Sequence, residues 1–67
     1  MKHLHEKLKE LRNEKGYSQQ NVADALGVTR SAYANYEQGL REPSLDTFQK
    51  ICQFYEISAD DMLGIKK

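Results

Sequence analysis

Arg30 and Asn35 are the side chains whose types and spacing are best suited to recognition chemistry. Both are expected on the outward side of one short segment, about Thr29 to Glu37. An arginine guanidinium can donate two hydrogen bonds to guanine O6 and N7, and an asparagine amide can pair with adenine N6 and N7. Both residue types are also common on ordinary exposed helices. The pair therefore indicates a site only if the neighbouring elements present it.

Catalytic and metal chemistry have no comparable support in the sequence, because no nucleophile with an acid–base partner is evident. His3 and His5 are two residues apart, which places them on different helix faces rather than at the i,i+4 spacing of metal ligands, and we expect them to be solvated. Cys52 is the only cysteine, and its apolar surroundings predict a small buried hydrophobic residue. We expect no enzyme, no metal and no cofactor.

The elements that position these residues are predicted to be helices throughout. Glycine and proline divide the chain, and none of the segments between them shows the alternation typical of a strand. Leucines at spacings of four and three predict a first helix over about Lys2 to Lys15. Apolar residues at similar steps predict another from the cap at Ser44 to about Tyr55, and they are Leu45, Phe48, Ile51, Cys52 and Tyr55. A short last helix is predicted from Ala59 to Leu63.

Two short helices joined by a tight turn are predicted in the middle of the chain. The first spans Gln19 to Leu26 after the capping residue Ser18, and the second is the Thr29 to Glu37 segment. Gly27 can adopt the positive φ that the turn needs. Helices joined in this way can cross steeply and leave the second one protruding towards a groove about as wide as a helix. Ordinary bundles also contain such pairs, so the spacing alone does not decide the function.

The residues of this central region resemble the Cro and lambdoid-repressor class of helix-turn-helix, the XRE family. The matching pattern is SQQxVAxxLGVTRSxYxxYExG from Ser18 to Gly39, followed by Pro43, Ser44 and Leu45. The likeness extends from Leu4 to Leu63. It implies an all-α fold, a compact five-helix lambda-repressor-like DNA-binding domain whose helices 2 and 3 form the helix-turn-helix. Residues 1–67 would be a single domain of this kind.

The resemblance also implies roles for individual residues around the third helix, the recognition helix of this class. The residues expected to contact bases in the major groove are Thr29, Arg30, Ser31, Ala34 and Asn35. Phosphate contacts are expected on either side of this helix, from Ser18 and Gln19 before it and from Gln38, the Gly39 backbone and Arg41 after it. Tyr33 and Tyr36 are expected in the core with their hydroxyls at the rim, where either hydroxyl could also reach a phosphate.

Two further positions follow from the same resemblance. Glu37 needs a partner, because an unpaired carboxylate near DNA would repel phosphates. Arg12 matches the family position whose guanidinium reaches this glutamate, so we predict a structural Arg12–Glu37 salt bridge. Leu40 stands where family members often carry a basic residue. It therefore indicates either a weaker electrostatic grip or a packing contact.

A homodimer on a palindromic operator is expected, because one short recognition helix contacts too few bases for specific affinity. Pairing needs an apolar surface near the last two helices. Ile57 and Leu63 are expected to close the monomer core, and the candidates for the dimer interface are Phe54, Met62 and Ile65.

Net charge gives a mixed indication of the partner. Ten basic and ten acidic residues cancel, although phosphate neutralisation is the main source of affinity for DNA. Residues 1–16 carry five basic and three acidic groups, whereas residues 42–67 carry three and five, so the N-terminal part is the one that can face phosphates. Neither a membrane span nor a signal peptide is expected, which predicts a cytoplasmic protein.

Two alternatives stay open at this stage. The neutral charge and Leu40 favour a helical module whose main partner is another protein, whereas Arg30, Asn35 and Gln19 favour double-stranded DNA. A repressor N-terminal domain that continues into a C-terminal sensor domain would also show the same pattern as a stand-alone regulator.

Overall fold

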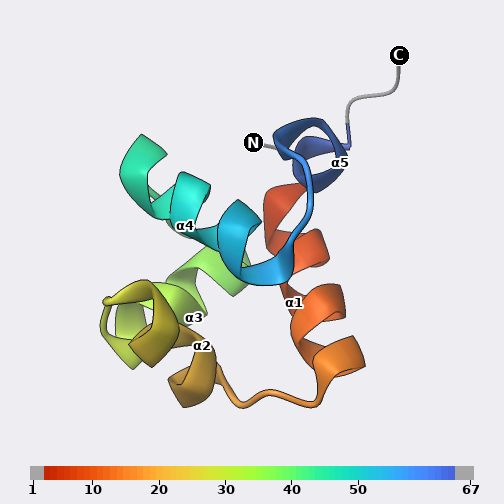
Figure 1. Ribbon diagram of the computed structural model, residues 1–67. Helices are drawn as coiled ribbons and strands as arrows, with labels where there is room; N and C mark the ends of the chain where they lie inside the picture. The colour runs from red at the N-terminus through yellow and green to blue at the C-terminus, as the bar shows by residue number, and fades with distance from the viewer. Residues whose placement is uncertain (1–2, 65–67) are drawn as a thin grey trace.

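Five helices make up most of the computed structural model, which describes residues 3–64 (Figure 1). They are α1 (Leu4–Lys15), α2 (Gln19–Leu26), α3 (Arg30–Gln38), α4 (Leu45–Tyr55) and α5 (Ala59–Leu63). The described residues contain no strand, and none of their helices is long and apolar enough to cross a membrane. The predicted all-α fold with five helices in this order is confirmed, with boundaries within two residues of those expected.

Side-chain caps begin four of the helices. The hydroxyls of Ser18, Thr29, Ser44 and Ser58 each accept a hydrogen bond from the backbone N–H three residues further on. At α2 the cap is reciprocal, because the Asn21 side chain accepts from the Ser18 N–H at 3.1 Å. α4 ends at Glu56, a non-glycine residue with a φ of 53°. Short-range chemistry therefore determines where most of the helices start.

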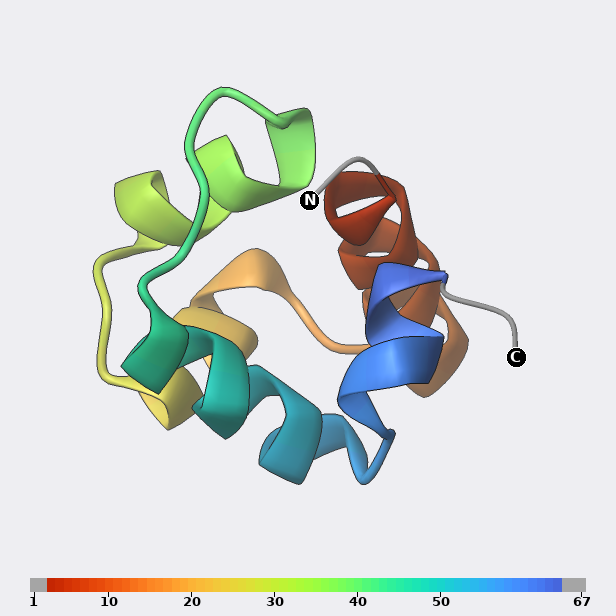
Figure 2. The same cartoon turned by 90° about the horizontal axis from the view of Figure 1, so that it is seen from above.

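The core lies where the apolar faces of all five helices meet. α3 packs against both α1 and α2, α4 packs against α2 and α5, and α5 also contacts α1. Figure 2 shows α1 and α5 on one side of the molecule and α2, α3 and the start of α4 on the other. The buried apolar residues are Leu4, Leu8, Leu11, Val22, Ala23, Leu26, Tyr33, Tyr36, Phe48, Ile51, Tyr55 and Met62. α3 is thus held from two sides.

Two predictions about apolar residues are wrong. Met62, a candidate for the dimer interface, is fully buried, because α5 packs it into the core instead of presenting it to a partner. Leu45, predicted in the core stripe of α4, is 70% exposed, because the first turn of that helix extends beyond the helices that cover the rest of it (Figure 1). The spacing of apolar residues indicates which face of a helix is buried, but not how far along the helix the neighbouring elements cover that face.

The other apolar candidates are partly buried. Ile57 and Leu63 pack against the core as expected. Cys52 is half-buried rather than buried, and desolvation raises the pKa of its thiol. Phe54 is also half-buried, with its ring centroid 5.5 Å from that of Tyr17. Ile65 lies outside the described residues.

The buried position of Met62 predicts a large loss of stability on truncation. Met62→Ala should lower the free energy of unfolding by about 2–5 kcal/mol, through lost apolar burial and the cavity left behind. Leu45→Ala is the matched control, because this side chain is exposed, and it should change stability by no more than about 0.5 kcal/mol. Urea unfolding followed by circular dichroism measures both. Equal effects of the two substitutions would contradict the assignment of Met62 to the core.

Candidate nucleic-acid interface

α3 is anchored along one face and free along the other. Its buried residues are Tyr33, Tyr36 and Glu37. The turn from α2 lies at the edge of the molecule in both ribbon views (Figures 1 and 2). Gly27 ends α2 there with a φ of 72°, a conformation that favours glycine. The Val28 N–H returns to Ala23 O at 3.0 Å, so the turn is hydrogen-bonded as well as short.

The predicted base-contacting residues lie on α3 and its N-cap, with their exposure graded along the helix. Thr29, Arg30 and Ser31 are exposed, whereas Ala34 and Asn35 are half-buried. The Thr29 hydroxyl accepts from the Ala32 N–H at 3.1 Å, so its oxygen serves the cap and its methyl group stays free for apolar contact. The first turn of α3 is therefore its most accessible part.

Donors for an anion gather at the start of α2. The capping box uses the Ser18 hydroxyl oxygen and the Ser18 N–H, but the first two amides of a helix, here those of Gln19 and Gln20, have no acceptor within it. The half-buried Gln19 donates one Nε2 hydrogen to Glu37 Oε1 at 3.3 Å. A side-chain amide carries a second hydrogen on the same nitrogen. Gln19 can thus be held in place and still donate outward.

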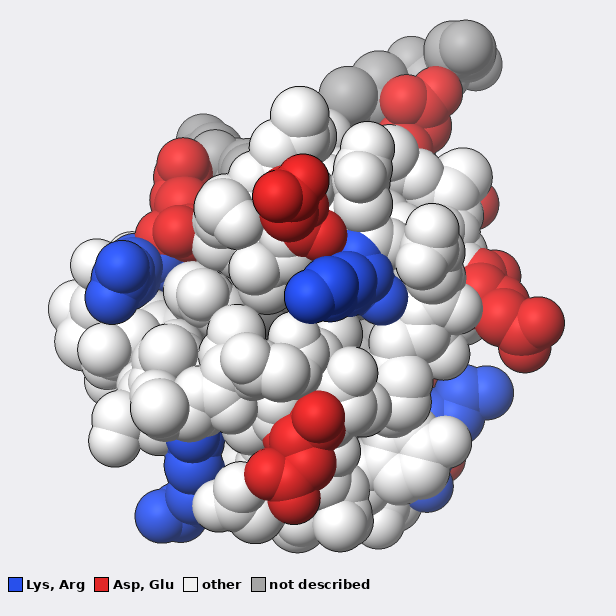
Figure 3. All heavy atoms as spheres, turned by 60° about the vertical axis from the view of Figure 1, so that its left-hand side comes forward, with Lys and Arg blue, Asp and Glu red and all other residues white. Residues whose placement is uncertain are grey.

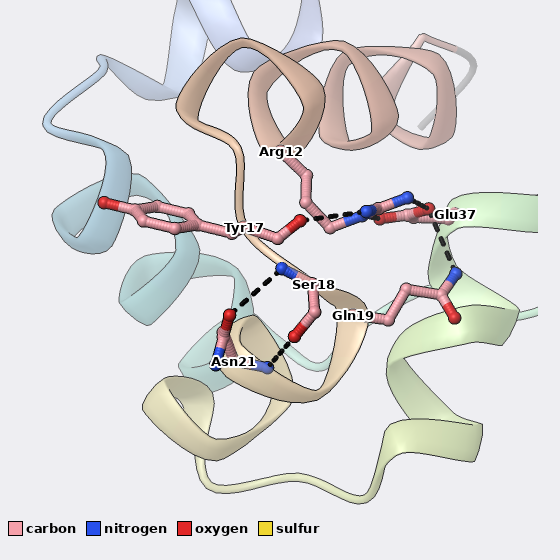
Figure 4. A network of polar contacts seen from close by, with 6 residues as sticks. All are labelled: Arg12, Tyr17, Ser18, Gln19, Asn21 and Glu37. Atoms are coloured by element: carbon pink, nitrogen blue, oxygen red, sulfur yellow. Dashed lines mark hydrogen bonds and ion pairs between the residues drawn. The ribbon is translucent and has the colours of Figure 1, made fainter.

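A buried ion pair connects this region to α1 (Figure 4). Arg12 Nε lies 2.6 Å from Glu37 Oε2, and Arg12 Nη2 lies 3.2 Å from Oε1. Arg12 Nη1 also donates to the Tyr17 carbonyl at 3.0 Å. The carboxylate is 2% exposed and the guanidinium side chain 18%. The salt bridge that the sequence led us to expect is therefore present, and it joins α1, the segment before α2, and α3.

Titration of Glu37 is controlled by opposing effects. Burial alone would raise the pKa of the carboxyl, but the hydrogen bonds and the positive charge that it meets, foremost those of Arg12, outweigh burial and hold that pKa below its usual range. The pKa of Arg12 is raised by the same pair. Both residues are consequently charged at neutral pH.

Tyr33 does not take the position expected for its hydroxyl. The side chain is fully buried, and the hydroxyls of Tyr33 and Tyr55 find no hydrogen-bond partner within the described residues. Burial raises the pKa of Tyr33, and the negative charge of Glu37 adds to that rise. A phosphate contact by the Tyr33 hydroxyl is therefore excluded, because it faces the interior rather than the rim.

The other predicted phosphate contacts lie beyond α3. Gln38, Gly39 and Arg41 are exposed. The Gly39 N–H, however, donates to Tyr36 O at 3.3 Å, and the Leu40 N–H donates to Asn35 O at 3.0 Å. Both amides are thus used to close the helix, and the prediction of a Gly39 backbone donor is wrong. Leu40 is 72% exposed, which excludes the packing contact considered for it within the described chain.

His5 reaches this same end of α3, although nothing in the sequence pattern indicated it. A side chain added at Gly39 would lie 3.2 Å from His5 Cγ and 3.4 Å from Nδ1. His3 stands in the same relation to Gly64, with Cδ2 at 3.2 Å. His3 is exposed, as expected, whereas His5 is half-buried against the end of α3, so the expectation that it is simply solvated is wrong.

The surface around α2 and α3 carries few charges. Figure 3 shows this side of the molecule, where basic side chains are separated from one another by uncharged residues. A pocket of about 190 Å³ lies instead between α1 and α5, with Glu6, Glu10 and Asp61 in its lining. Within residues 3–64, no cluster of three or more histidine, cysteine or acidic residues could hold a metal ion. The polar groups best placed for a ligand are those of α2 and α3.

Removing Arg12 should expose the cost of the buried carboxylate. Arg12→Ala is expected to lower the free energy of unfolding at neutral pH by about 3 kcal/mol, because it leaves Glu37 charged and buried without its partner. Arg30→Ala removes an exposed arginine and should change it by no more than about 0.5 kcal/mol. Thermal unfolding measures both, and unchanged stability in Arg12→Ala would contradict a structural role for the pair.

The pH dependence of stability should change sign in the same variant. In the parent chain, folding lowers the pKa of Glu37. The contribution of Glu37 to the free energy of unfolding is therefore complete above the pKa of the unfolded chain and is lost as pH falls through the pKa of the folded chain. Without Arg12, burial dominates and raises that pKa, so stability should instead be lost as pH rises through the raised value. Adding Glu37→Gln should remove this loss. Parallel pH profiles for parent and Arg12→Ala would contradict the account.

The comparisons with known proteins agree with this arrangement. The helix-turn-helix family model matches residues 8–62. Over 58 residues the chain is 48% identical to the SPbeta prophage-derived uncharacterized HTH-type transcriptional regulator YonR of Bacillus subtilis (strain 168), covering 87% of this chain and 54% of that protein. It is 40% identical over 62 residues to the HTH-type transcriptional regulator AnsR of the same organism, covering 92% and 53%.

A more distant relative is the cryptic phage CTXphi transcriptional repressor RstR of Vibrio cholerae, 33% identical over 58 residues, which are 87% of this chain and 52% of that protein. The chain thus spans about half the length of these three curated relatives. The family match extends from within α1 to within α5 and includes the whole of α2 and α3. The chain therefore belongs to the helix-turn-helix family, in its XRE class, whose members are DNA-binding proteins and not enzymes, as the sequence predicted.

Proposed function

We propose that this chain is a sequence-specific transcriptional regulator, a repressor, that binds a palindromic operator as a homodimer with α3 in the major groove. The observation that carries the proposal is the position of α3, anchored by Tyr33, Tyr36 and Glu37, with Arg30 and Asn35 on its other side. The relatives support regulation of transcription, because their names describe regulators and, for RstR, a repressor. Residues 1–67 act as one domain in this proposal.

Base recognition falls to the accessible side of α3. Arg30, exposed in the first turn, donates to guanine O6 and N7, and Asn35 pairs with adenine further along the helix. Ser31 accepts or donates at either base. The Thr29 methyl group and the Ala34 side chain suit the methyl group of thymine, because both are apolar groups on the accessible side of α3.

Phosphate contacts fix the register on either side of α3. Ser18 and Gln19 meet one strand at the positive end of the α2 dipole, and Gln38 and Arg41 meet the other. Most of these groups are neutral. A chain without net charge can bind DNA in this way, because the donors are placed individually rather than supplied by a broad basic surface.

A homodimer places two copies of α3 on half-sites one helical turn apart. With Met62 buried and Ile65 outside the described residues, Phe54 is the interface candidate that the fold leaves accessible. Its ring meets Tyr17, which is 38% exposed, so the two form a small aromatic surface. We place this dimer in the cytoplasm, where the operator is.

A protein-binding module is the second candidate function. The observation that favours it is the exposure of two large apolar side chains, Leu40 at 72% and Leu45 at 70%. Both lie at the ends of the connection between α3 and α4. A protein partner or a sensor domain following this one would be suited to such a surface.

Binding to mixed-sequence duplex DNA separates the two candidates. The DNA proposal predicts affinity that falls linearly with salt on a logarithmic scale, because cations displaced from phosphates are released. With Arg30 and Arg41 as the cations near DNA, the slope should be about −2 for one protomer and about −4 for a dimer. Fluorescence anisotropy over a salt series measures it. Absence of binding at low salt would contradict the DNA proposal.

Arg30 and Gln19 should differ in how they affect sequence preference. Arg30→Ala is expected to weaken the preferred site by about 1–3 kcal/mol and to relax one base position, whereas Gln19→Ala should weaken all sequences about equally. Selection from a random DNA pool gives the preferred site and its symmetry, and anisotropy gives the affinities. An equal loss on every sequence for Arg30→Ala would refute its role in base recognition.

A further inference from the structure

His5 fills the space that a side chain at position 39 would occupy. Gly39 has a φ of 74°, and a Cβ atom there would lie within 3.5 Å of three atoms of the imidazole ring. The residues around this glycine, Gln38 and Arg41, are the two proposed to contact phosphate after α3. The His5 side chain from α1 thus lies beside Gly39, which has no side chain of its own.

The imidazole is chemically suited to this place. The Gly39 and Leu40 amides are both used within the α3 cap, so donors for a phosphate here must come from side chains. His5 keeps 37% of its side chain exposed, and a protonated imidazole donates from both ring nitrogens. Histidine also changes charge between about pH 5 and pH 8, unlike the other donors proposed here.

Other charged groups near His5 determine how strong such a contact can be. Glu6 Oε1 lies 3.8 Å from His5 Nε2, and its negative charge opposes a phosphate there. Lys9 follows one turn later on α1, and Arg41 and Glu42 lie in the segment after Gly39. Glu6 is 74% exposed, so water screens its charge.

We infer that His5 is a further phosphate-binding residue, which extends the DNA interface from the end of α3 onto α1 and makes affinity increase as pH falls. This inference rests on the proposed function, because it concerns the same bound DNA. The sign follows from linkage: phosphate binds the protonated ring more tightly, so DNA binding takes up a proton and is favoured at lower pH.

His3 provides a matched control within the same helix end. Its ring packs against Gly64, the left-handed residue that ends α5, as that of His5 packs against the end of α3. The proposed DNA contacts lie at α2, at α3 and in the segment after α3, and none lies at α5. Replacing either histidine removes packing against a glycine and a charge near a helix end. Only replacement of His5 would also remove a phosphate contact.

Anisotropy with a fluorescent mixed-sequence duplex, at about pH 6 and about pH 8, tests the inference. His5→Gln should weaken binding roughly two- to fivefold at the lower pH, the strength of one exposed charge contact, and reduce the salt slope there by about 0.9 per protomer. At the higher pH it should have little effect. His5→Lys should keep the low-pH affinity and abolish its dependence on pH. His3→Gln should behave as the parent.

Each other result has a definite meaning. If parent and His5→Gln bind equally at both pH values, or if His3→Gln shows the same loss, the inference is wrong while DNA binding stands. If His5→Lys fails to restore affinity although circular dichroism shows a folded chain, packing rather than charge explains the histidine, which also overturns the inference. If the parent does not bind the duplex at low salt, the proposed function fails first.

Discussion

A carboxylate in a protein interior is stable only when hydrogen bonds and an opposite charge replace the water it has lost. The Glu37 side chain is only 2% exposed, and its carboxylate oxygens accept hydrogen bonds from Arg12 on α1 and Gln19 on α2. Arg12 extends the same set of contacts to the Tyr17 carbonyl, just before α2 begins. Glu37 therefore ties the C-terminal part of α3 to both α1 and α2 and, together with the buried Tyr33 and Tyr36, fixes how α3 lies against them.

The same interaction connects the fold with the proposed interface. Gln19 has one amide hydrogen committed to Glu37 and a second one available, so the carboxylate that fixes α3 also limits where the Gln19 side chain can point. In the proposed complex, the Glu37 carboxylate would thus contribute both to stability and to the placement of Gln19 on DNA. A molecule with no net charge benefits from such an arrangement, because each donor has to be in the right place when few charges attract the ligand from a distance.

Local chemistry was the part of the fold that could be predicted from sequence. Helix starts follow from hydroxyls at Ser18, Thr29, Ser44 and Ser58, which satisfy amides three residues away, and such bonds need nothing beyond their own segment. The Arg12–Glu37 pair was predicted by resemblance, because the family pattern relates two distant positions. Depth of burial was not predictable, as Met62 and Leu45 show, since a helical stripe is the same whether or not a neighbour covers it.

Two contacts at the C-terminal end of α3 also escaped prediction. The Gly39 backbone was expected to contact phosphate because the family resemblance implies it, whereas the end of α3 itself uses that amide. His5 could be assigned to a helix, but its meeting with Gly39 depends on how α1 crosses α3. No short-range pattern contains that information.

The contact between His5 and Gly39 also restricts how related sequences can diverge. A residue with a side chain at position 39 would have to adopt a φ of 74°, and its Cβ atom would lie 3.2 Å from the imidazole, so the ring would have to shift to admit it. The reverse does not hold, because a small residue at position 5 leaves glycine at 39 undisturbed. Substitution at position 39 therefore carries a backbone cost whatever residue stands at position 5, and the imidazole ring adds a packing cost that a smaller residue at position 5 would remove.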